Sequence, residues 1–174
     1  MINETNSWYV LYVRTGQERD VAEAIQVLPD TTAIVPMRIM LELRRGVWTE
    51  VSRTLFPAYV FCKTLLTASR YYELVNTSGV IRMLGSGSSL LPLPVPETEM
   101  SPVLALGMGG RPIGVSQAVR TSGGRIRIIE GPLRLLPGRI TRIDARRRRA
   151  TVELPLMGED KPVQLALRVI NNPI

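Results

Sequence analysis

The 174-residue chain divides into two parts of different composition, and the boundary falls near residue 117. Residues 1–116 carry ten Lys/Arg and ten Asp/Glu, whereas residues 117–174 carry twelve Lys/Arg against five Asp/Glu. The whole net charge of +7 therefore lies in the last third, while all nine aromatic residues lie between Trp8 and Tyr72. Such a split predicts two domains with different partners.

Several classes of function are excluded by residues that the chain lacks. It has one cysteine, Cys62, and no histidine. An internal disulfide framework, a Cys/His zinc site and a histidine-based triad all need more than this. The chain also lacks the run of about 18 apolar residues that a membrane helix requires, and its N-terminus lacks the layout of a signal peptide. We therefore expect a cytoplasmic, non-enzymatic protein without cofactor or metal, in which Cys62 is a buried, unreactive thiol.

The first part of the chain has the pattern of a mixed α+β domain. Residues 7–15 are apolar on both alternating faces, which is typical of a central strand covered on each side. Thr15 and Glu18 have capping-box spacing, and the apolar repeat that follows predicts a helix over 16–28. The remaining expected elements are a hairpin of strands 33–43 and 47–53 that turns at Gly46, strands over 55–63 and 80–84, and a helix over 68–77 capped by Thr67. This order predicts an antiparallel sheet with helices on one face.

The second part reads as a small all-β barrel. Short alternating strands are expected over 125–129, 138–144, 150–154 and 162–170, with no helix among them. Because Ile140 and Ile143 are three residues apart, one strand must bulge for both to face inward. A short helix is expected over 101–107. We expect domains over 1–107 and 123–174, joined by a linker over 108–122, although part of that linker has the pattern of a strand.

Three segments, in this order, resemble those of a known family. They are WYVLYVRTGQE (8–18), LFPAYVF (55–61) and IRIIEGPLRLLPGRITRID (126–144). Together they are similar to the NusG-type transcription elongation factors, and the last segment resembles the KOW motif. The resemblance implies an N-terminal NGN domain, an antiparallel sheet with helices, followed by an SH3-like KOW barrel. Ala58 stands where the family commonly has glycine.

The resemblance also implies a partner for the first domain. NGN domains dock on the clamp helices of RNA polymerase, bridge the DNA channel and favour the elongating enzyme. The family's docking surface is an aromatic-lined apolar pocket, and the matching residues of this chain are Tyr12, Phe56, Tyr59 and Phe61. Arg70 aligns near a stretch that meets the polymerase gate loop in specialised members. Leu55, Val60 and Cys62 are then expected in the core, while Trp8 and Tyr9 fit core packing and interface equally.

The four consecutive arginines, Arg146–Arg149, have few carboxylates near them in sequence. Arg134, Arg139, Arg142 and Lys161 are expected on other turns and strands of the same barrel, so one basic face is predicted. The planar guanidinium group of arginine is suited to bidentate hydrogen bonds with phosphate and guanine. The alternative is a solvated turn. Single-strand binders stack bases on aromatic side chains, and residues 123–174 have none, so a structured RNA such as a hairpin is favoured.

These features predict a processive antitermination factor that binds RNA polymerase and a structured leader RNA in the nascent transcript. Within the family, the sequence of the KOW domain resembles most closely that of the specialised paralog LoaP. The alternative is a general NusG-type elongation factor whose KOW domain binds a ribosomal protein or the termination factor Rho. A monomer is expected in either case.

Overall fold

A computed structural model describes residues 5–85, 92–107 and 110–170, and it confirms the α+β fold class. The chain forms two compact units. Unit 1 comprises Met1–Val35 and Phe56–Ser101, and unit 2 comprises Pro36–Leu55 and Pro102–Ile174. The functional division into domains over 1–107 and 123–174 stays a prediction. None of the helices in the described ranges is long and apolar enough to cross a membrane.

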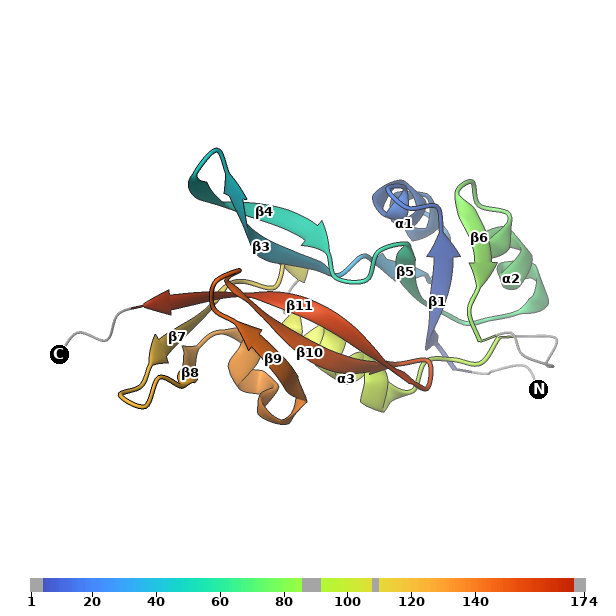
Figure 1. Ribbon diagram of the computed structural model, residues 1–174. Coiled ribbons are helices and arrows are strands. Elements are labelled where there is room, and N and C mark those ends of the chain that lie inside the picture. The colour runs from blue at the N-terminus through green and yellow to red at the C-terminus, as the bar shows by residue number, and fades with distance from the viewer. Residues whose placement is uncertain (1–4, 86–91, 108–109, 171–174) are drawn as a thin grey trace. The chain divides into compact units, whose positions relative to one another are not determined.

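Unit 1 is built on a four-stranded sheet in the order β2-β5-β1-β6 (Figure 1). Its strands are β1 (Ser7–Val13), β2 (Thr32–Ile34), β5 (Tyr59–Thr64) and β6 (Val80–Met83). β1 pairs antiparallel with β5 on one side and with β6 on the other. Residues Tyr9 to Leu11 are all buried. The prediction of a central strand covered on both faces is therefore confirmed.

Two helices of unit 1, α1 (Glu18–Gln26) and α2 (Ala68–Val75), pack on the same face of this sheet. Ile25 of α1 and Leu74 of α2 enter the core formed with Leu11 and Val60. The expected cap of α2 is confirmed, because the Thr67 hydroxyl accepts from the Arg70 amide at 3.1 Å.

The predicted capping box of α1 is wrong. Gln17 is the residue before the helix, and no side chain caps it there. The Glu18 carboxylate accepts from the amide of Gly16 instead, since the chain turns at Gly16 with a φ of 91°. The helix is also shorter than the expected 16–28.

The predicted hairpin exists as β3 (Met37–Arg44) and β4 (Val47–Thr54). Its turn has positive φ at Arg45 and Gly46, 48° and 80°, as a two-residue hairpin requires. The expected strand over 33–43 is interrupted, because Pro36 separates β2 from β3. β2 pairs with β5 in unit 1, whereas β3 and β4 belong to unit 2.

Unit 2 contains an open five-stranded sheet, a half-barrel in the order β8-β7-β11-β10-β9 (Figure 1). The strands are β7 (Ser116–Arg120), β8 (Ile126–Glu130), β9 (Ile140–Asp144), β10 (Arg149–Leu156) and β11 (Glu159–Ile170). β7 lies in the range expected as linker and pairs parallel with the end of β11. Residues 108 and 109 of that range lie outside the described residues.

Three short helical segments after β6 differ from the expectations. Two 3₁₀ turns, η2 (Pro132–Leu135) and η3 (Pro137–Arg139), join β8 to β9, where no helix was expected. The expected helix over 101–107 begins earlier, as α3 (Glu97–Leu106), with Pro102 in its interior. The boundary between the two units falls within α3.

Alternate residues of β10 define the inner face of the half-barrel. Ala150, Val152 and Leu154 are all fully buried there. The register between β9 and β10 shifts after Thr151, so that Ile140 pairs with Val152 although Arg142 pairs with Thr151. This irregularity confirms the predicted bulge between Ile140 and Ile143, whose side chains both line the same pocket.

The outer face of the half-barrel carries Arg149, Thr151 and Gln164, and the hairpin packs on it. Ala166 of β11 is fully buried in a cluster with Met40 and Leu41 of β3. Trp48, Val51 and Val115 border this cluster. The backbone joins the elements as well, because the Ile39 amide donates to Ile113 at 2.8 Å and the Ile113 amide donates to Met37 at 2.7 Å.

Gly131, in the turn after β8, permits a close backbone approach. Its φ is 96°, and a Cβ atom there would lie 2.7 Å from the Cα of Ser116. Ser116 is fixed in turn, because its hydroxyl accepts from the Leu133 amide at 3.0 Å. We expect Gly131→Ala to lower the free energy of unfolding by about 3 kcal/mol, from strain and displaced backbone.

The measurement is denaturant unfolding of the full chain. The matched control is Gly138→Ala, since Gly138 has nothing within 4 Å of such a Cβ and no positive φ. Equal unfolding midpoints for the two variants would contradict the expectation.

Candidate functional site

The four aromatic residues predicted to face RNA polymerase form one cluster in unit 1. Tyr12 and Tyr59 lie opposite each other on β1 and β5, with ring centroids 6.1 Å apart. Phe56 stacks on Tyr59 at 6.4 Å and contacts Phe61 at 5.7 Å. The structure therefore brings together all four residues matched from the family pattern.

Only the two tyrosines of this cluster reach the surface. Tyr12 and Tyr59 are partly exposed, whereas the side chains of Phe56 and Phe61 are 5% and 0% exposed. The phenylalanines therefore support the tyrosines from below and cannot themselves touch a partner in this conformation. Trp8 and Tyr9 are buried, as are the three residues expected in the core, Leu55, Val60 and Cys62.

A basic residue that sequence reasoning missed adjoins the tyrosines. Arg82 pairs with Tyr12 across β1 and β6, and its guanidinium lies 5.9 Å from the centre of the Tyr12 ring. The distance fits a cation–π contact. The sequence offered no signal for it, because the register of β6 against β1 decides which residue lies opposite Tyr12.

Arg70, predicted to reach the gate loop, is occupied inside unit 1. Its guanidinium donates to the Thr31 hydroxyl at 3.0 Å and lies 3.3 Å from the Glu73 carboxylate. Only 16% of its side chain is exposed. The observed contacts join α2 to the segment before β2, and a polymerase contact by Arg70 stays a prediction.

Glu18 is a buried carboxylate that helps to position the tyrosine surface, by which we mean the exposed parts of Tyr12 and Tyr59. The sequence predicted only a capping role for it. It accepts from the Gly16 amide at 2.9 Å and from the Ala58 amide at 2.7 Å. Ala58 has a φ of 66°, a left-handed conformation that costs alanine about 1 kcal/mol. The Val13 amide donates to the Ala58 carbonyl at 2.8 Å. These bonds hold the residue that directly precedes Tyr59.

Cys62 lies in the core of unit 1, as predicted. Burial raises the pKa of its thiol to about 12, and the charge of Arg70 offsets this only in part. The thiolate is therefore negligible at neutral pH. Within the described ranges, no three His, Cys, Asp or Glu side chains gather as a metal site would require.

Arg146 to Arg148 lie in the turn between β9 and β10, and Arg149 is the first residue of β10. The Asp144 carboxylate accepts from the Arg147 amide at 2.9 Å, and Arg148 closes the turn with a φ of 55°. Arg146 and Arg147 are exposed, whereas Arg148 and Arg149 are half-buried. The run is therefore split into two arginines that face solvent and two that face the rest of unit 2.

The half-buried pair contacts the outer face of the half-barrel and the hairpin. The Arg148 guanidinium lies 4.4 Å from the centre of the Trp48 ring, and Arg149 donates to the Gln164 side chain at 3.0 Å. Residues 123–174 hold no aromatic residue, as noted from the sequence, but the hairpin brings one to the arginines. Trp48 was missed because it lies a hundred residues earlier in the chain.

The other predicted basic residues do not all share this face. Arg142 lies opposite Thr151 on the outer face, and Arg134 and Arg139 lie on η2 and η3. Lys161 pairs with Leu154 and therefore lies in the row of the inner face, where it forms an ion pair with Glu159 at 3.0 Å. The expectation of one basic face is thus wrong for Lys161.

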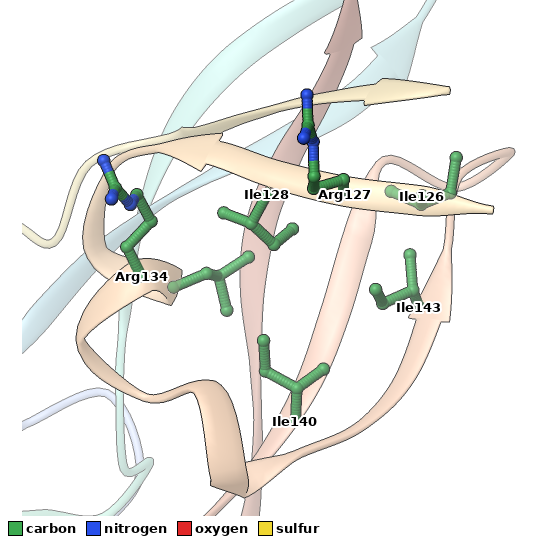
Figure 2. A pocket seen from close by; sticks show the side chains of 7 residues that line it. Ile126, Arg127, Ile128, Arg134, Ile140 and Ile143 are labelled. Atoms are coloured by element: carbon green, nitrogen blue, oxygen red, sulfur yellow. The ribbon is translucent and has the colours of Figure 1, made fainter. Parts of the chain in front are cut away.

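A pocket of about 430 Å³ lies between the two edge strands, β8 and β9. Figure 2 shows Ile128, Ile140 and Ile143 lining it, whereas the guanidinium groups of Arg127 and Arg134 point away from the isoleucines. Arg134 donates to the Ile129 carbonyl of β8 at 3.2 Å. The pocket is apolar inside and basic at its border, which suits an aliphatic side chain.

Replacing Glu18 tests whether it supports the tyrosine surface. We expect Glu18→Ala to leave two amides without an acceptor and to lower the free energy of unfolding by about 3 kcal/mol. Thermal or denaturant unfolding measures this, and exposed Asp20→Ala in the same helical turn is the control. A Glu18→Ala protein as stable as the Asp20→Ala protein would show that the two hydrogen bonds of Glu18 do not contribute to the free energy of unfolding.

Comparison with known proteins places the chain in a family. The family model described as transcription termination factor nusG matches residues 6–104. The chain is 25% identical to the transcription termination/antitermination protein NusG of Bacillus subtilis, with 95% of this chain and 97% of that protein covered. It is 27% identical to the protein of the same name from Halalkalibacterium halodurans, with coverage of 91% and 94%.

A solved structure described as "Domain interaction in Thermotoga maritima NusG" is similar as well. Its TM-score is 0.56 at 26% identity, and the match covers 93% of this chain and 94% of that one. The family match spans the tyrosine surface and the hairpin, and the relatives extend over the half-barrel. The chain therefore belongs to the NusG family of transcription termination and antitermination factors.

Proposed function

We propose that the chain is a cytoplasmic, non-enzymatic, processive antitermination factor of the specialised LoaP type. Its NGN domain binds the clamp helices of RNA polymerase, and its KOW half-barrel binds a structured leader RNA. Both activities consist of binding alone.

The polymerase contact is assigned to Tyr12 and Tyr59. Their rings are partly exposed, are packed against each other, and are fixed from below by Phe56 and Phe61. Aromatic residues that are rigidly held and only partly covered are typical of the residues that dominate binding energy in interfaces. Arg82, beside Tyr12, adds a positive charge at the border of this surface.

The RNA contact rests on one observation, the exposure of Arg146 and Arg147 at the tip of the β9–β10 turn. Among the described residues, the only carboxylate that forms an ion pair with either arginine is Asp144, 3.9 Å from Arg147, and 75% of the Arg147 side chain is exposed. Arginine donates to phosphate and guanine with two N–H groups at once. In the part of the chain that the structure describes, Trp48 is the one ring for which a cation–π contact with the arginine run is found, and Arg148 lies over it, which favours phosphate and groove contacts over base stacking.

We expect the double variant Tyr12→Ala with Tyr59→Ala to lose at least ten-fold in affinity for RNA polymerase, because two central aromatic contacts are removed. Co-purification and fluorescence titration with core polymerase measure this. Tyr72→Ala is the control, since Tyr72 is 62% exposed on α2 outside the cluster. A folded double variant with the affinity of the control would refute the assignment.

We expect Arg146→Ala with Arg147→Ala to reduce the slope of log affinity against log salt by about 1.5, since each phosphate contact contributes about 0.7 to 0.9. The measurement is a salt-titrated binding assay with a leader RNA stem-loop. The control is Arg14→Ala with Arg19→Ala, which removes the same charge from exposed positions of unit 1. Equal slopes for the two variants would indicate a merely solvated turn.

One observation favours a second candidate function for the half-barrel. The apolar pocket between β8 and β9 could accept an aliphatic side chain of a protein (Figure 2). A ribosomal protein or Rho, the partners of general NusG factors, would then take the place of RNA. Binding to purified ribosomal protein or Rho that is lost in Ile128→Asp, with no binding of the stem-loop, would favour this alternative.

A further inference from the structure

Arg38, on β3 of the hairpin, lies where the hairpin crosses the outer face of the half-barrel. Its guanidinium donates to the backbone carbonyl of Gln164 on β11. The side-chain carbonyl of the same glutamine accepts from Arg149 at 3.0 Å. One neutral residue therefore holds two guanidinium groups that come from segments far apart in the chain.

Among the described residues, no carboxylate pairs with either of these two guanidinium groups. The two acidic side chains of the hairpin are taken by other arginines, since Glu42 pairs with Arg44 and Arg53, and Glu50 pairs with Arg168. Asp144 lies opposite Arg149 in the sheet register, but its carboxylate is taken by Arg147. Within the described ranges no ion pair reaches Arg38 or Arg149. Burial and the charge of Arg149 both lower the pKa of Arg38, and the Nε of Arg38 is buried without a partner. Two half-buried like charges are unfavourable until an anion joins them.

The geometry restricts the chemistry of that anion. Gln164 uses one terminal nitrogen of each guanidinium, so the second terminal nitrogen of each has N–H groups left to donate. An anion with several oxygens can accept from both arginines at once, as a phosphodiester does. Arg146 and Arg147 continue the basic surface from Arg149 around the turn, so a nucleic-acid backbone could follow it.

We propose that Arg38, Arg149 and Gln164 form a phosphate-binding site, and that the β3–β4 hairpin is part of the surface that binds nucleic acid. The assignment to RNA rests on the proposed function, whereas the phosphate site itself does not. Arg149 contributes the half-barrel's charge, Arg38 contributes the hairpin's charge, and Gln164 orients both. Phosphate bound there also links the hairpin to the half-barrel.

The test uses Arg38→Gln, which removes the charge and keeps hydrogen-bond donors toward Gln164. The control is Arg53→Gln on the neighbouring strand, because Arg53 is neutralised by Glu42. Affinity for a GC-rich RNA stem-loop is measured across a range of salt concentrations. We expect Arg38→Gln to lower the salt slope by about 0.7 to 0.9 and Arg53→Gln to leave it unchanged. An unchanged slope in Arg38→Gln would overturn the role of the hairpin in RNA binding.

A second measurement tests the phosphate-binding site independently of the proposed RNA-binding function. Inorganic phosphate should raise the melting temperature of the wild-type chain above its value in chloride at equal ionic strength, and the increase should be lost in Arg38→Gln. If phosphate stabilises both proteins equally, the site is refuted. If it stabilises only the wild type while no stem-loop binds, the site stands and the proposed function fails.

A DNA stem-loop, a double variant and an acidic peptide test the site further. A DNA stem-loop of the same sequence with the same dependence on Arg38 supports phosphate recognition without selection for RNA. The double variant Arg38→Gln with Arg149→Gln should lose less affinity than the product of the single losses, because both arginines hold one group. Binding of a polyglutamate peptide that depends more strongly on Arg38 than stem-loop binding does would overturn the phosphate assignment in favour of an acidic protein.

Discussion

The packing of the hairpin on Ala166 is the contact on which the basic surface of unit 2 depends. Ala166 is fully buried, and its small side chain lets Met40 and Leu41 approach the outer face of the half-barrel. Close packing of this kind leaves few alternative positions for the strand. Trp48 thereby reaches Arg148, and Arg38 reaches Gln164. The basic surface is consequently a product of two segments that lie more than a hundred residues apart.

In unit 1 the central strands are covered on both faces, so few of their side chains are exposed to solvent. Among Tyr59, Val60, Phe61 and Cys62, only the tyrosine retains exposure. It lies at the start of β5, next to the left-handed Ala58 that Glu18 holds in place. The exposed aromatic surface of β5 is thus confined to the start of the strand, where turn geometry and not strand alternation decides which way the Tyr59 ring points.

Local patterns in the sequence predicted much of the fold. A stretch that is apolar on both faces indicated β1, and alternating apolar residues indicated β10. Gly46 indicated the hairpin turn, and the spacing of Ile140 and Ile143 indicated a bulge. What could not be predicted depends on register and on contacts between distant segments. Glu18 bonds to Ala58, forty residues away, and the register of β10 with β11 turns Lys161 to the inner face. Placement of the hairpin on β11, rather than with its sequence neighbours, has no local signal.

The burial of Cys62 has a practical consequence for studying this protein in solution. Cys62 is the only cysteine of the chain, and burial raises the pKa of its thiol to about 12. A maleimide or methanethiosulfonate reagent at neutral pH therefore meets almost no native thiolate. A single cysteine introduced at an exposed position, such as Leu43 beside the hairpin turn or Tyr72 on α2, would be labelled without background. Fluorescence transfer or spin–spin distances between such labels can then be measured in the otherwise unaltered chain.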